Sequence, residues 1–135
     1  MYIEEALLKE LAANVAVKAI IGQRIYYVTA PQDVTNPVNP YAVVQKISDT
    51  PAKHRFDAAA GASAARIQIT IIGDTYYDCK RVATAIKTAI NGFKGTMGGV
   101  GGLAVGACFI AGENDIPYDT GAKLFGLAVD YMFYY

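Results

Sequence analysis

An alternating strand followed by a capped helix constrains this chain more than any other sequence feature. In residues 65–72, "ARIQITII", isoleucines occupy every second position between polar side chains, which is the period of a β-strand with one buried face. Thr75, with Asp78 three residues later, predicts the start of a helix, and apolar side chains at helical spacing follow until Gly92. This helix is therefore expected to pack on a sheet through its apolar stripe.

The rest of the chain supplies further elements of the same layered fold. Spacing and composition predict an amphipathic helix over residues 3–13, a short helix over 14–21, and strands over 24–28, 41–48, 103–111 and 122–135. We therefore predict an α+β fold for residues 1–135, a single domain with the main element order α-β-β-β-α-β-β. The sheet is expected to be mainly antiparallel, with two main helices packed on one face and the other face free for partners.

The final segment, "AKLFGLAVDYMFYY", is apolar on both faces of its predicted strand. A strand of this kind has to be covered on both sides. We expect Tyr131, Phe133 and Tyr135, which share one face, to lie in the core or in subunit contacts.

Two segments between these elements are predicted to be loops. Residues 49–64 contain turn formers and small residues without periodicity, which predicts an exposed, mobile loop between hairpin strands. Residues at its tip are expected to contact a neighbouring molecule: Lys53, His54, Arg55 and Phe56. Residues 113–121, "ENDIPYDTG", predict a turn-rich connection.

Residues 95–112, "GTMGGVGGLAVGACFIAG", carry no charge and contain seven glycines. A glycine at every fourth position from Gly98 to Gly106 is typical of packed membrane helices, but a spanning helix needs about 20 predominantly apolar residues. A phosphate-binding loop does not fit, because the glycines follow a helix and Lys94 precedes them. We expect a loop over 95–102 and then a strand. The glycines expected to be mobile are Gly98, Gly99, Gly101 and Gly102.

The composition argues against nucleic-acid binding and for contacts between proteins. Twelve basic residues balance twelve acidic ones, so the chain lacks the positive excess that neutralises phosphates. Only 18% of the residues are charged while 53% are hydrophobic, and ten are tyrosines. Part of this apolar surplus is expected to be buried against other subunits, where tyrosine is enriched.

The cysteines and the N-terminus indicate a cellular compartment rather than a chemistry. Cys79 and Cys108 form no C-x-x-C motif, which predicts free thiols rather than a disulfide or a zinc site. The first residues, "MYIEEALLKEL", place acids where a signal peptide needs a basic head. We expect an intracellular product without a cofactor.

The candidates for catalysis and metal binding are weak. Ser48, Ser63, His54 and Asp57 could form a triad only through the fold, and the histidine lies in a polar loop without a nucleophile-elbow motif. Carboxylates that could bind a hard cation are Glu113, Asp115 and Asp119, but their spacing matches no EF-hand and favours an exposed turn. We predict no catalytic, cofactor or metal site.

Four segments carry a family resemblance that extends over nearly the whole chain: "ALLKELAANVAVKAIIGQRIYYVTAPQ", "NPYAVVQKIS", "ARIQITIIGDTYYDCKRVATAIKTAI" and "YDTGAKLFGLAVDYMFYY". In order and pattern they resemble the small tail-terminator family of tailed bacteriophages and prophages, also called tail-completion or head-tail joining proteins. The sequence departs from the usual look of this family in the glycines of residues 95–102 and in its weakly charged final strand.

The resemblance implies a structural, non-enzymatic virion protein made in the host bacterial cytoplasm. Such proteins form a ring, typically a homohexamer, at the head-proximal end of the tail tube. The ring stops tube polymerisation, contacts the tail tube protein and docks the head connector or stopper. The genome passes through its channel without specific binding, which agrees with the neutral charge balance, and no membrane is involved. The tip of the 49–64 loop would then touch a neighbouring subunit or the tube.

Two other functions remain open at this stage. The chain could be another neck ring protein of the stopper or connector type. Less favoured is a small intracellular enzyme that works through His54 and the acidic segment 113–119.

Overall fold

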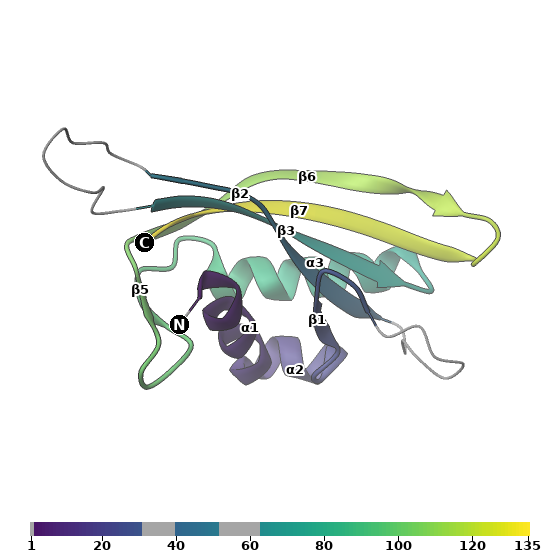
Figure 1. Cartoon of the computed structure of the whole chain (residues 1–135). Helices are drawn as coiled ribbons and strands as arrows, with labels where there is room; N and C mark the ends of the chain where they lie inside the picture. The colour runs from purple at the N-terminus through teal and green to yellow at the C-terminus, as the bar shows by residue number, and fades with distance from the viewer. Residues whose placement is uncertain (1, 31–39, 52–62) are drawn as a thin grey trace, which may run out of the picture.

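Three helices cover one face of a five-stranded sheet in the computed structural model, which describes residues 2–30, 40–51 and 63–135 (Figure 1). The strand order is β1-β2-β3-β7-β6. The bounds of the strands are Ile25–Tyr27 for β1, Tyr41–Pro51 for β2, Ser63–Gly73 for β3, Ala107–Asp119 for β6 and Leu124–Tyr134 for β7. Every pair is antiparallel except β1 with β2, so the predicted α+β fold with a mainly antiparallel sheet is confirmed.

The helices begin and end at the residues that local sequence signals predict. They are α1 (Ile3–Ala13), α2 (Val15–Ile21) and α3 (Tyr76–Ile90). The Asn14 side chain caps α2 by accepting a hydrogen bond from the Val17 amide at 3.1 Å, and Thr75 caps α3 in the same way at 3.1 Å. Gly22 follows α2 at a φ of 58°, a left-handed conformation that favours glycine.

The core fills the space between the helices and one face of the sheet. The alternation predicted for residues 65–72 holds, because its isoleucines at 67, 69 and 71 are fully buried. The helices meet them with buried side chains at helical spacing: Ile3, Leu7 and Leu11 from α1, and Val82, Ile86 and Ile90 from α3.

A small separate hairpin replaces the predicted loop and the start of the predicted strand. Its strands are β4 (Gly95–Met97) and β5 (Leu103–Val105). The predicted strand over 103–111 is therefore wrong as one element, because it breaks at Gly106, whose amide donates to the carbonyl of Tyr134 at 2.7 Å. Side-chain parity shifts at this break, so that Val105 and Cys108 are both buried. Simple alternation across residues 103–109 could not reveal that shift.

The predicted turn over residues 113–121 is wrong as well. Residues up to Asp119 continue β6, with register shifts after Ile110 and after Ile116, and the turn occupies only residues 120–123. The polar side chains of this strand are compatible with a sheet edge because α3 supplies partners for them. The β2–β3 hairpin is longer than predicted as well. β2 runs to Pro51 and β3 begins at Ser63, so both ends of the predicted loop over residues 49–64 belong to strands.

Candidate interaction surfaces

The sheet has one face that no element of the described chain covers, opposite the three helices (Figure 1). The strand register assigns side chains to this face, because directly opposed residues share a side. We call it the open face. Its residues include Val43 and Gln45 of β2, Arg66, Gln68, Thr70 and Ile72 of β3, Ala128, Asp130, Met132 and Tyr134 of β7, and Phe109, Gly112, Asn114 and Ile116 of β6.

A single ion pair carries the charge of the open face among these residues. The Arg66 guanidinium Nη2 lies 2.5 Å from Oδ2 of Asp130, whose residue is only 5% exposed. Gly112 and Ala128 are small, so no large side chain projects from these two positions of the open face. Phe109, near the sheet edge, is 54% exposed. A nearly uncharged, shallow face of this kind suits contact with another protein better than contact with phosphates.

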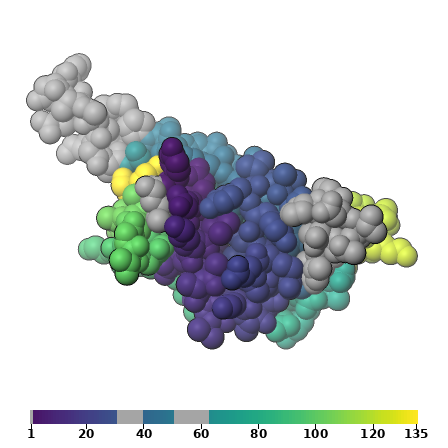
Figure 2. All heavy atoms as spheres, turned by 60° about the horizontal axis from the view of Figure 1, so that its bottom comes forward, coloured from purple at the N-terminus to yellow at the C-terminus, as the bar shows by residue number. Residues whose placement is uncertain are grey.

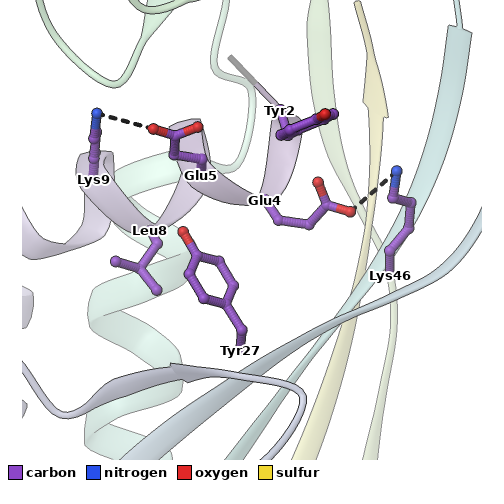
Figure 3. A pocket seen from close by; sticks show the side chains of 7 residues that line it. All are labelled: Tyr2, Glu4, Glu5, Leu8, Lys9, Tyr27 and Lys46. Carbon is purple, nitrogen blue, oxygen red and sulfur yellow. Dashed lines mark ion pairs between the residues drawn. The ribbon is translucent and has the colours of Figure 1, made fainter.

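A groove lies between α1 and the β1–β2 edge of the sheet, with a volume of about 770 Å³ (Figure 3). We call it the α1 groove. Its lining residues are Tyr2, Glu4, Glu5, Leu8 and Lys9 from the α1 end, Tyr27 of β1 and Lys46 of β2. The groove was not predicted from the sequence, where its only local signal is the aromatic pair in "RIYYV".

The charges of the α1 groove are paired within it. The Lys9 ammonium lies 3.2 Å from Glu5, and the Lys46 ammonium lies 3.0 Å from Glu4 (Figure 3). The hydrogen bond to Glu4 is the main cause that raises the pKa of Lys46. Burial, followed by the negative charge of Glu5 and Glu4, raises the pKa of Tyr27, so its hydroxyl stays protonated. The groove thus presents aromatic and aliphatic surface with no net charge.

A strained turn follows Tyr27, which lines the α1 groove. Val28 has a φ of 61°, and the Thr29 amide donates to the Tyr27 carbonyl at 2.5 Å, which closes a γ-turn. A positive φ is rare for a β-branched residue. The Val28 side chain is 68% exposed, so burial of this side chain does not explain the conformation. Within the described residues, no strand pairs with this edge of β2 beyond Val44.

The β4–β5 hairpin projects on the other flank of α1. Figure 1 and Figure 2 both place it on the side of α1 away from β1. Glu10 of α1 ties its turn down by accepting a hydrogen bond from the Gly98 amide at 3.1 Å. At the tip Val100 is fully exposed, between Gly99 and Gly101, which have left-handed φ values of 78° and 76°.

The residues predicted to make subunit contacts divide between two places. Tyr131 and Phe133 are fully buried among the chain's own side chains. Tyr135 is half-buried, and its hydroxyl donates to Asp49, while its backbone pairs with Ser63. The predicted tip residues Lys53, His54, Arg55 and Phe56 lie outside the described residues. The predicted mobility of Gly98, Gly99, Gly101 and Gly102 stays a prediction, and the structure positions them in the hairpin turn.

The acidic residues of β6 bind separate partners rather than one another. Glu113 pairs with Lys80 and Lys87 of α3, and Asp115 accepts a hydrogen bond from the Tyr76 hydroxyl. Asp119 accepts from two amides of its own turn. Across residues 2–30, 40–51 and 63–135, no group of three or more histidines, cysteines or acids is arranged to hold a metal ion.

The serines and cysteines also lie apart in the described part of the chain. Ser48 is in β2 and Ser63 begins β3, whereas the other predicted triad members, His54 and Asp57, fall outside it. Both thiols are buried, and burial raises the pKa of Cys108 to about 12. They therefore stay protonated and unreactive near neutral pH.

The uncharged segment 95–112 forms the β4–β5 hairpin and the start of β6 rather than a helix. Of the helices that the structure describes, none has the length and apolarity to cross a membrane.

Comparison with known proteins identifies the family. The family model for "Tail completion protein gp17" matches residues 5–135. A chain of the solved "Virion of native gene transfer agent (GTA) particle" has the same fold, with a TM-score of 0.72 and 15% sequence identity over 98% of this chain and 92% of that one. A search of curated proteins finds no match. Because the model spans nearly the whole chain, the protein belongs to the tail completion protein gp17 family of phage tail proteins.

Proposed function

We propose that this protein assembles into a homo-oligomeric ring, a hexamer, that caps the head-proximal end of a phage tail tube. The ring ends polymerisation of the tube and joins the tail to the head. Membership in the tail completion family carries the proposal. It also accounts for the open face, which is nearly uncharged and needs a protein partner to be covered.

The ring works through contacts rather than chemistry. Its partners are copies of the same chain, the tail tube protein and the head connector or stopper, and its place is the head-proximal end of the tail. With equal numbers of acidic and basic residues, the protein lets DNA pass without holding it by its phosphates. No catalytic activity is expected.

Electron microscopy of a phage or prophage that lacks this gene tests the proposal. We expect full heads, unjoined tails and tails of excess length, and a plasmid copy of the gene should restore joined particles. Tails of normal length that stay unjoined would instead indicate a stopper or connector. Joined tails of normal length would contradict both functions.

A further inference from the structure

We infer that the tip of the β4–β5 hairpin, residues 98–102, seats in the α1 groove of a neighbouring copy and forms the contact between successive subunits. This inference rests on the proposed ring. It assigns the ring two different surfaces on each subunit, one projecting and one hollow.

The hairpin has the shape and chemistry of an inserted element. Each of its strands has only three residues, and a two-stranded hairpin on its own is marginally stable in water. Buried Met97 and Val105 anchor its base in the core, while Val100 extends fully into solvent. An exposed aliphatic side chain at the tip of an uncharged segment of 18 residues is suited to burial against another surface.

The α1 groove matches this tip in polarity. Tyr2 and Tyr27 are 79% and 46% exposed, and Leu8 also lines the groove (Figure 3). The lysines and glutamates already neutralise one another in pairs, so an uncharged occupant leaves no carboxylate or ammonium without its partner. A charged occupant would have to break these pairs.

The positions of the two surfaces suit a ring. Figures 1 and 2 place the hairpin on the side of α1 away from β1, whereas Tyr27 of β1 and Lys46 of β2 line the groove together with α1. When the tip of one copy fits the groove of the next, the pair keeps one free groove on the first copy and one free tip on the second. This is a heterologous contact, and it closes into a ring when the rotation between copies divides a full turn.

The decisive experiment uses assembled tails, in a host without the chromosomal gene. Two variants that each carry one added cysteine are supplied together, Val100→Cys with either Tyr27→Cys or Tyr2→Cys, and the purified tails are oxidised. A cross-linked dimer that contains one copy of each variant is expected. Val100→Cys paired with Thr84→Cys, on the exposed side of α3, is the matched control and should give none. The native cysteines are buried and contribute no background.

A second variant separates the contact from folding. Val100→Asp should keep the wild-type melting temperature of the free protein, because this side chain is fully exposed, and Val100→Leu should keep function. We expect Val100→Asp to abolish tail capping, since its buried carboxylate would lie beside Glu4 and Glu5, whose lysine partners are already paired. Normal capping by Val100→Asp, or capped tails without the cross-link, would overturn this inference and leave the proposed function standing. Tails that lack the wild-type protein at their head-proximal end would overturn the proposed function.

Discussion

Two residues mark a close backbone contact and an unsatisfied buried hydroxyl in this fold. Gly102 leaves no space for a side chain, since a Cβ there would lie 2.1 Å from the Met97 carbonyl oxygen. Tyr131 is fully buried, yet its hydroxyl has no hydrogen-bond partner within the described residues. Burial, with the nearby Cys108 and Glu113, raises the pKa of that hydroxyl, so it stays neutral.

Replacing Tyr131 by phenylalanine should leave stability unchanged or raise it. The substitution keeps the buried ring and removes a polar group that is desolvated without compensation. Tyr131→Ala, in contrast, should cost about 3–5 kcal/mol through lost packing. Urea unfolding of both variants measures this. A loss of more than about 1 kcal/mol in Tyr131→Phe would mean that the hydroxyl is hydrogen-bonded in solution.

Gly102→Ala should destabilise the hairpin by about 1–3 kcal/mol, because the backbone around Met97 must move to admit a methyl group. Gly112→Ala is the control, since a Cβ there meets nothing within 4 Å. Hydrogen exchange at the β4 and β5 amides reports the local effect, and thermal unfolding reports the global one. Equal behaviour of the two variants would contradict this close approach.

Elements show which parts of the structure the sequence could predict. The helix starts at Asn14 and Thr75 were predictable, since each cap depends on a side chain and an amide three residues apart. The extent of β6 was not, because α3 lysines distant in sequence stabilise Glu113 in a strand. The β4–β5 hairpin could not be predicted for a similar reason, since the predicted strand over 103–111 breaks at Gly106, whose amide bonds to β7.

The edge strand β6 depends on the turn after α3 for its protection. The Asn91 side chain accepts a hydrogen bond from the Ile110 amide at 3.0 Å, and the Gly92 amide donates to the Cys108 carbonyl at 2.7 Å. Asn91→Ala should therefore lower stability by about 1 kcal/mol and increase aggregation at high concentration. Thr88→Ala, at an exposed position of α3, is the control in light scattering and thermal unfolding. Equal aggregation of both variants would sink the idea.

The tie between the C-terminus and β2 should make stability depend on pH at the alkaline end. Burial and the hydrogen bond to Asp49 raise the pKa of Tyr135 to about 12 from the ordinary 10. A raised folded-state pKa means that this stabilisation is complete below pH 10 and is lost as the pH rises toward 12.

Tyr135→Phe should accordingly be less stable than wild type at pH 8, and the difference should shrink as the pH rises from 10 to 12. Urea unfolding at several pH values measures the difference, and an ultraviolet titration should lose one late-ionising tyrosine. A difference that does not change with pH would contradict this role of the hydroxyl.

At the scale of the whole molecule, the fold and the existence of a free sheet face could be predicted, but the residues that form the surfaces could not. Periodicity over residues 65–92 is enough to predict one helix layer against one sheet. The α1 groove, however, joins residues from three elements, and the flatness of the open face depends on the register of four strands. Apart from the aromatic pair in "RIYYV", no local pattern indicates which residues form these surfaces.

A charge on the open face should stop assembly without unfolding the protein. Phe109→Asp alters a residue that is 54% exposed, so the melting temperature should change little. A carboxylate buried unpaired against a partner costs about 3 kcal/mol or more, which corresponds to a loss of affinity of roughly a hundredfold, so the titre of joined particles should fall. Thr84→Asp adds the same charge on the helix side and should keep the wild-type titre. Equal titres of the two variants would mean that this part of the face touches no partner.

The covering of β6 by Asn91 and Gly92 has a consequence for growth of the assembly. Polymers that propagate by strand pairing need two compatible edges on every molecule, and here one edge is blocked over its first half and flanked by charged side chains over its second. Pairing through the remaining edge of β2 would join two copies edge to edge, and no further copy could then add by strand pairing. Open-ended fibres are thereby disfavoured, and the subunits of the proposed ring would be held together by side chains rather than by a shared backbone ladder.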